Sequence, residues 1–139
     1  MSEVDKNTIR VRDVMKTDFH MIDGKATITE AIRVMKQHRT SMLFVNKFHK
    51  DDEYGVLNAG IIAKLVLAKD RAADRVNVYE INEKPLISVT PDMDIRYCSR
   101  MFARYGLMRA PVMENGEIIG VVSPIQLVLD GLCELSGIS

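Results

Sequence analysis

Apolar side chains recur along the chain with the two spacings that distinguish helices from buried strands. An i, i+3, i+4, i+7 pattern predicts one face of a helix at Ile28, Ala31, Ile32 and Met35. Thr27 precedes this face and Glu30 follows it by three residues, so we expect a capping box at the helix start. The short runs 41–45 and 54–57 then predict two strands, separated by a polar loop.

The same order of elements returns in the second half. Asn58 is placed to cap a helix that follows the first two strands, and Asp94 is placed to cap the next helix. Strands are predicted at 110–113 and 118–122, and the Asn-Gly dipeptide at 115–116 favours a type I′ hairpin turn between them.

The last helix has its own start signal. Ser123 provides a capping hydroxyl, and Pro124 suits the first helical position. Its apolar face is predicted at Ile125, Val128, Leu129 and Leu132. The helix that follows Asp94 has its predicted face at Ile95, Cys98, Phe102 and Tyr105.

The two halves form an internal repeat. Shifting the sequence by 67 residues aligns apolar and turn positions over nearly the whole chain, with Val11 falling on Val78. We expect two strand–helix–strand–strand–helix units, at 8–70 and 78–135, joined by a polar linker at 71–77. Because a unit of about 60 residues is marginal alone, both should share one α/β (α+β) domain. It would have pseudo-two-fold symmetry, with the sheets packed together and the helices outside.

Composition narrows the functional class. The 139-residue chain has 19 basic and 19 acidic side chains, whereas nucleic-acid binding needs a clustered basic excess. Apolar residues, 47% of the chain, suffice for a core, yet no run approaches the roughly 18 residues of a membrane span. The polar segment 1–10 does not resemble a secretory signal. Cys98 and Cys133 lack CxxC spacing, so we expect buried free thiols and a cytoplasmic location.

Signals for catalysis or metal binding are weak. His20, His38 and His49 have no ligand spacing and no partner cysteine, so no metal site is expected. The acidic run 51–53 lacks the alternating spacing and glycine of a calcium loop. No Ser-His-Asp arrangement, P-loop or GxGxxG motif is present. We therefore expect a protein that is not an enzyme.

Several short segments, in order and twice over, carry a family resemblance. They are VRDVM at 11–15 with its echo VYEIN at 78–82, SVTPD at 88–92, RAPV at 109–112 and GVVS at 120–123. Together they resemble a tandem pair of cystathionine β-synthase (CBS) domains, known as a Bateman module. The resemblance implies two βαββα units that form a pair of clefts between their sheets.

The resemblance also implies a function. Such modules commonly bind AMP, ADP, ATP or S-adenosylmethionine as regulatory ligands, need no cofactor, form homodimers and act as sensors. Their closing signature often reads Gly-h-h-Thr/Ser-x-x-Asp, with h apolar. Its hydroxyl assists phosphate or ribose binding at a helix N-terminus, where free N–H groups favour an anion. Its Asp accepts hydrogen bonds from the ribose hydroxyls.

This chain departs from that signature in both halves. In the first half the hydroxyl position is Asn58 and the Asp position is Ile61, which cannot accept a hydrogen bond. In the second half Ser123 keeps the hydroxyl, and Gln126 replaces the Asp with an uncharged acceptor. We therefore expect ligand binding preferentially in the second cleft. Arg109 strengthens that cleft, because its guanidinium suits a phosphate.

The two expected sites differ in quality. The second cleft should be formed by Ser88, Val89, Thr90, Arg109, Ala110, Pro111, Ser123 and Gln126. The weaker first cleft should be formed by Met21, Ile22, Asp23, Met42, Leu43, Asn58 and Ile61. The alternative is that these residues are core and strand-edge positions, with Arg109 a solvated cation or an ion-pair member.

Two functions remain open at this point. The chain is expected to be a stand-alone regulatory module that binds an adenosine-containing ligand and signals to an unknown partner protein. The alternative is a ligand-free dimeric scaffold for protein interactions, with degenerate nucleotide sites. In either case the helices carry more apolar surface than one small sheet can cover, so a homodimer is expected.

Overall fold

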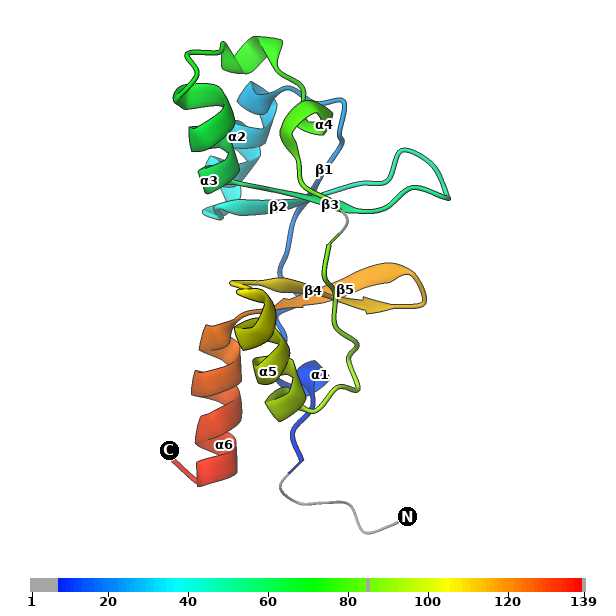
Figure 1. The fold of residues 1–139 in the computed structure, drawn as a ribbon, viewed down its shortest axis with the longest axis vertical. Helices are drawn as coiled ribbons and strands as arrows, with labels where there is room; N and C mark the ends of the chain where they lie inside the picture. The colour runs from blue at the N-terminus through cyan, green and yellow to red at the C-terminus, as the bar shows by residue number, and fades with distance from the viewer. Residues whose placement is uncertain (1–7, 85, 139) are drawn as a thin grey trace. The chain divides into compact units, whose positions relative to one another are not determined.

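The computed structural model describes residues 8–84 and 86–138 as two compact units. The central unit comprises Phe19–Leu86. The terminal unit combines the chain up to Asp18 with the chain from Ile87 onward. In Figure 1 the central unit runs from blue through cyan to green, whereas the terminal unit contains both the blue N-terminal segment and the yellow-to-red C-terminal half.

The central unit is a three-stranded sheet with helices on one face (Figure 1). Its elements are β1 (Met21–Ile22), α2 (Ile28–His38), β2 (Met42–Val45), β3 (Gly55–Asn58), α3 (Ala59–Ile62), the π-helical η1 (Ala63–Leu67), the 3₁₀ turn η2 (Ala73–Arg75) and α4 (Val78–Ile81). The sheet order is β1-β2-β3, in which β1 runs parallel to β2 and β3 antiparallel to it.

The terminal unit repeats this plan around the hairpin β4–β5 (Figure 1). Its elements are α1 (Val11–Val14), α5 (Ile95–Tyr105), β4 (Ala110–Glu114), β5 (Glu117–Val122), the π-helical η3 (Gln126–Leu132) and α6 (Cys133–Ser136). Val89 pairs parallel with Val112 in the place that β1 takes in the other unit. The expected repeat of strand, helix, strand, strand and helix is confirmed.

The start signals at Asn58 and Asp94 and the turn signal at 115–116 act as predicted, and Thr27 forms the N-cap half of the expected capping box. Thr27 Oγ1 accepts a hydrogen bond from Glu30 N, and Asn58 Oδ1 accepts one from Ile61 N. Asp94 Oδ1 accepts one from Arg96 N. The two-residue turn between β4 and β5 has φ of +53° at Asn115 and +79° at Gly116, the positive values that a type I′ turn requires.

Each repeat gives its opening segment, which contains α1 in the first repeat and α4 in the second, to the other repeat. Val11 N donates to Met93 O at 2.8 Å, and Val78 N donates to Ala26 O at 2.8 Å, two bonds related by the same 67-residue shift. Val11 and Val14 are buried in the terminal core, whereas Val78 and Ile81 are buried in the central core. The repeat boundaries 8–70 and 78–135 are therefore not the boundaries of the compact units.

The segment 71–77 does not behave as the polar linker that we expected. It contains η2, and its last apolar side chain, Val76, is 2% exposed within the central core. Val76 O also accepts the hydrogen bond from Ile28 N at 2.9 Å. The segment is attached to the central unit by Val76 and by the bridge between Asn77 and Thr27, which the run of charged residues in the sequence did not indicate.

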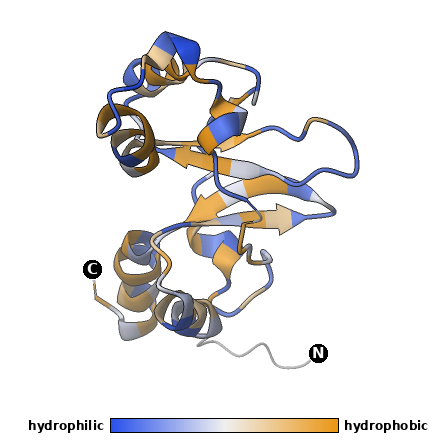
Figure 2. Cartoon of the chain, turned by 45° about the horizontal axis from the view of Figure 1, so that its top comes forward, coloured by the Kyte–Doolittle hydropathy of each residue, from blue (hydrophilic) through white to orange (hydrophobic). Residues whose placement is uncertain are grey.

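The two cores lie between the helices and one face of each sheet, and the strands are predominantly hydrophobic in Figure 2.

Cys98 is fully buried, but Cys133 is only partly buried, so the expectation of two buried thiols holds for one of them. In the last helix Leu127 and Gly131 face the core, and the predicted apolar face is 48–64% exposed. None of the helices in the described part of the chain is long and apolar enough to cross a membrane.

Candidate functional site

The polar residues of the expected second cleft meet at the start of the last helix. The helix begins at Pro124, as predicted. Gln126 Oε1 accepts hydrogen bonds from Ser123 N, at 2.9 Å, and from Ser123 Oγ. The Gln126 side chain therefore caps the N-terminus of the helix. The Ser123 hydroxyl, which was expected to accept a backbone hydrogen bond as the cap, donates to Gln126 instead. The oxygen of Ser123 keeps acceptor capacity, and the Gln126 amide nitrogen keeps its N–H donors.

Strand register brings Arg109 to the same end of the hairpin. Ala110 is paired with Val122, so the residues that flank this pair, Arg109 and Ser123, leave the sheet side by side in the ladder. The Arg109 side chain is exposed and forms no ion pair within the part of the chain that the structure describes. The ion-pair alternative for this residue therefore has no support among the described residues.

The segment 88–90 lies on the other side of β4. Val89 is 1% exposed, and its backbone is saturated: Val89 N donates to Pro111 O at 3.0 Å, and Val89 O accepts from Met113 N at 2.9 Å. Ser88 and Thr90 are exposed on either side of it. Val89 is thus a core residue, as the alternative reading proposed, and a ligand at this edge would contact its two neighbours.

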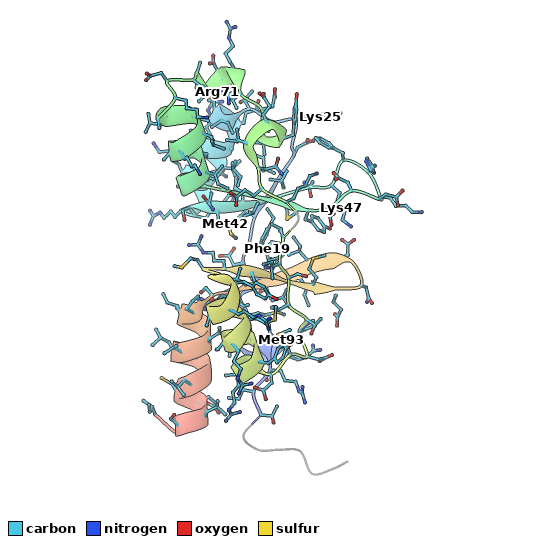
Figure 3. All side chains as sticks on the ribbon, in the orientation of Figure 1. Phe19, Lys25, Met42, Lys47, Arg71 and Met93 are labelled. Carbon is cyan, nitrogen blue, oxygen red and sulfur yellow. The ribbon has the colours of Figure 1, made fainter. Side chains whose placement is uncertain are left out.

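The first cleft offers little polar chemistry. Ile61 and Leu43 are buried core residues at 7% and 0% exposure, and Met42, labelled at β2 in Figure 3, is 9% exposed. The Asn58 oxygen is bonded to Ile61 N at 2.8 Å. The Asp23 carboxylate accepts a hydrogen bond from Lys25 N at 2.8 Å.

The remaining residues of the first cleft belong to β1. Met21 pairs with Phe44 and Ile22 pairs with Val45, so their backbones are part of the sheet. Every residue expected in this cleft lies in the central unit, whereas every residue expected in the second cleft lies in the terminal unit.

Ionisable groups near the opening segment form an ion pair, a hydrogen bond and a helix cap within the terminal unit. Arg12 forms an ion pair with Asp92, and Arg10 donates to the Asp92 backbone oxygen at 2.6 Å. The hydrogen bond and charge of Arg12 lower the pKa of Asp92 below its usual value. Asp94 caps α5, so the neighbouring carboxylates Asp92 and Asp94 both have structural partners.

Cys98, His20 and His38 are not among the residues expected in either cleft. Burial raises the pKa of the Cys98 thiol to about 11, which makes it a poor nucleophile at neutral pH. His20 and His38, which looked unrelated in sequence, stack with ring centroids 3.8 Å apart at 16°. Among residues 8–84 and 86–138, no group of three or more His, Cys, Asp or Glu side chains is arranged to hold a metal ion.

Sequence reasoning missed the bond between Ser123 and Gln126. The signal was present, because a serine followed three residues later by glutamine at a helix start is a capping-box spacing. The family pattern drew attention to the same spacing for ligand binding. The structure shows that a hydrogen bond joins these two side chains.

Comparison with known proteins gives matches to both sequence repeats. The model of the CBS domain matches residues 11–65 and 78–129. The CBS domain-containing protein YhcV of Bacillus subtilis (strain 168) is 27% identical over 116 residues, which are 81% of this chain and 79% of that protein.

Solved structures agree with this fold. The hexameric CBS-CP12 protein from bloom-forming cyanobacteria matches with a TM-score of 0.81 and 28% identity, over 90% of this chain and 72% of that chain. A CBS domain pair in complex with 5′-methylthioadenosine and S-adenosyl-L-methionine matches with a TM-score of 0.74 and 19% identity, over 88% and 94% of the two chains. At that identity the second likeness concerns the fold alone.

Proposed function

Because the chain belongs to the CBS domain family, we propose that it is a regulatory module whose terminal unit binds an adenosine-containing ligand. The observation that carries this proposal is the exposed guanidinium of Arg109, which lies beside the Ser123 helix start and has no ion-pair partner among the described residues. A cation at that position complements phosphate or the carboxylate of S-adenosylmethionine. AMP, ADP, ATP and S-adenosylmethionine are therefore the candidate ligands.

In this proposal each residue of the site contacts a particular part of the ligand. Arg109 holds the charged end of the ligand, and the Gln126 amide group contacts the ribose. The hydrogen bond from Ser123 Oγ to Gln126 must open or be shared for the glutamine oxygen to accept from a ribose hydroxyl. Ser88 and Thr90 provide exposed groups at the edge of the site.

Signalling to a partner protein would follow from differential affinity. A ligand shifts the population of module conformations only as far as it binds one of them better than another. The Ser123–Gln126 bond is a local contact that differs between ligand-free and ligand-bound forms in this proposal. The partner protein then responds to the start of the last helix, where that contact lies.

A thermal-shift panel with AMP, ADP, ATP and S-adenosylmethionine tests ligand binding. A ligand present at about 100 times its Kd should add about 2.7 kcal/mol to the free energy of unfolding. Arg109→Ala and Gln126→Ala should both weaken binding, whereas Arg100→Ala, an exposed arginine on α5, should not. Unchanged affinity in the first two variants would contradict the assigned site.

A dimeric scaffold is the second candidate function. It is favoured by the closed Ser123–Gln126 bond and by Ile61 at the position where a carboxylate would bind ribose. The scaffold is also consistent with the exposed apolar face of the last helix, which a second copy would cover. No stabilisation by any ligand of the panel at millimolar concentration would favour this function over the first.

A further inference from the structure

The central unit contains a shallow pocket that neither candidate function uses. It has a volume of about 580 Å³ and is lined by Lys25, Phe48, Asn77 and Tyr79. Phe48 comes from the nine-residue loop 46–54 between β2 and β3, and Tyr79 comes from α4. The equivalent loop of the terminal unit is a two-residue turn. Phe48 therefore comes from a loop that is longer in the central unit than in the terminal unit.

Two aromatic rings face solvent at this pocket. The exposed fractions of Phe48 and Tyr79 are 48% and 51%, and their ring centroids lie 6.0 Å apart at 67°, an edge-to-face pair. Gly24 lies beneath Phe48: a Cβ atom at Gly24 would be 3.0 Å from Phe48 Cζ. The glycine therefore allows the ring to lie close to the backbone while its other surface stays open.

The loop holds Phe48 in this position through its backbone. Phe48 N donates to Asp52 Oδ2 at 2.9 Å, and Lys84 Nζ pairs with Asp52 Oδ1 at 2.8 Å. Lys84 Nζ also lies 5.8 Å from the centre of the Phe48 ring. Since the loop is tied to the segment that follows α4, the aromatic surface is formed before any partner binds, which lowers the entropic cost of binding.

The charged side chains around the pocket differ in whether they are paired. Asp23 Oδ1 accepts from Lys25 N, and Glu80 accepts from Asn77 N at 2.8 Å and pairs with Arg71. The Lys25 ammonium group, labelled beside α4 in Figure 3, pairs with no carboxylate within the described ranges 8–84 and 86–138. The pocket thus combines an open aromatic surface with one positive charge at its edge.

We propose that this pocket docks a segment of a partner protein that carries an aromatic side chain next to an acidic residue. The aromatic side chain packs on Phe48 and Tyr79, and the carboxylate pairs with Lys25. A shallow, open surface suits a side chain presented by another protein, because a small free ligand needs a concave site that covers most of its surface. This proposal uses the central unit alone, so it stands or fails independently of ligand binding in the terminal unit.

The test is a titration of the ¹⁵N-labelled full chain with three capped tripeptides, followed by amide chemical shifts. Acetyl-Glu-Phe-Glu-amide should give saturable shifts at Lys25, Phe48 and Tyr79. Acetyl-Gln-Phe-Gln-amide lacks the charge and acetyl-Glu-Ala-Glu-amide lacks the ring. Both should bind about threefold more weakly or worse, as expected for loss of one exposed charge pair or one partly buried ring.

Matched variants separate this pocket from non-specific binding. Lys25→Glu and Phe48→Ala should each reduce the affinity for acetyl-Glu-Phe-Glu-amide, whereas Lys69→Glu, the same charge change at an exposed turn of the central unit, should not. Retained spectral dispersion shows that the variants are folded. Equal binding of the glutamine peptide, shifts at other residues, or no saturable shift would overturn the proposal. A response of the same amides to AMP would also overturn it, by indicating a nucleotide site.

Discussion

Gly120 lies where the opening segment of the chain crosses β5. Lys16 and Val121 exchange backbone hydrogen bonds of 2.8 and 2.9 Å beside it, and a Cβ atom at Gly120 would be 2.9 Å from Lys16 O and 2.7 Å from Met15 Sδ. The backbone atom cannot yield as a flexible side chain does. Gly55 meets Asn82 and Glu83 in the same way in the central unit, so both glycines admit an exchanged segment.

Gly120→Ala should destabilise the protein by about 1–3 kcal/mol, the usual range for overpacking of a tight site. Urea denaturation of the variant and the wild type would measure the difference. Gly60→Ala is the matched control, because its new methyl group meets only Asn58 Oδ1, at 3.3 Å, and should cost less. Equal stability of Gly120→Ala and wild type would contradict this account of the close approach.

The Arg12–Asp92 ion pair should make stability depend on pH. The pair lowers the folded-state pKa of Asp92 below its ordinary value of 3.8, so its contribution is present above pH 3.8 and is lost as pH falls through the lower pKa. The difference in unfolding free energy between wild type and Asp92→Asn should therefore shrink on acidification. Denaturation curves from neutral pH to about pH 2 would show it.

Asp51→Asn, at an exposed loop position, provides the comparison for that pH series. Because Arg12 belongs to the opening segment and Asp92 to the segment before α5, the pair joins two distant parts of the chain in the terminal unit. A difference between wild type and Asp92→Asn that does not change with pH would show that the carboxylate contributes by some means other than its charge.

At the scale of elements, the last helix presents an exposed apolar face. Ile125, Val128, Leu129 and Leu132 share that face and are 48–64% exposed. Contiguous exposed apolar surface of this kind commonly marks an interface. The homodimer expected from the sequence would cover it, which makes the helix the natural place to interrupt self-association.

Leu129→Glu should shift the chain from dimer to monomer without unfolding it, because Leu129 is 62% exposed and outside both cores. Light scattering after size-exclusion chromatography would give the mass, and circular dichroism would report the fold. Ala103→Glu, an exposed position of α5, should leave the mass unchanged. A wild-type mass of one chain at micromolar concentration would remove the dimer proposal.

At the scale of the whole molecule, the exchange of opening segments ties the N-terminal end of the chain to its second half. Val11 and Val14 are 0% and 5% exposed in the terminal core, and Lys16 pairs with β5. The terminal unit therefore lacks part of its core and one sheet edge until the opening segment docks. The central unit obtains the same parts from Val78, Ile81 and Glu83.

Deleting the chain through Lys16 should expose β5 and α5 to solvent exchange while β2 and β3 remain protected. Hydrogen exchange followed by mass spectrometry measures this in the deletion variant and in wild type. Adding a synthetic peptide of residues 8–18 should restore part of the protection, since it resupplies Val11 and Val14. Unchanged protection of β5 in the deletion variant would contradict the role of the opening segment.

Much of the fold could be predicted because its signals are local. Apolar patterns predicted strands β2 to β5 and the helices that follow Thr27, Asn58, Asp94 and Ser123, whereas the short helices α1 and α4 were not predicted. Caps at Thr27, Asn58 and Asp94 predicted where three of these helices begin. The Asn-Gly turn and the 67-residue repeat were also predicted from the sequence. The ordered family segments indicated a CBS pair, and the match of the family model to both repeats confirms it.

The candidate site was predicted less completely, because its properties depend on contacts between distant or competing groups. The spacing of Ser123 and Gln126 does not decide whether their side chains bind a ligand or hydrogen-bond to each other, because that depends on side-chain geometry. Whether Arg109 has an ion-pair partner also depends on the fold. Ser123, Gln126 and Arg109 were all found from the sequence, and ligand binding at them remains a prediction.

The sequence by itself determined the repeated elements, their start and stop signals and the family, since each rests on neighbours within a few turns of chain. Only the tertiary structure decided which repeat receives each opening segment, because short apolar segments such as 11–14 and 78–81 fit the pattern of either core. It also decided that Val76, within the segment 71–77, belongs to a core and that the Phe48–Tyr79 surface stays open. These outcomes depend on burial and on long-range hydrogen bonds, which act between residues far apart in the chain.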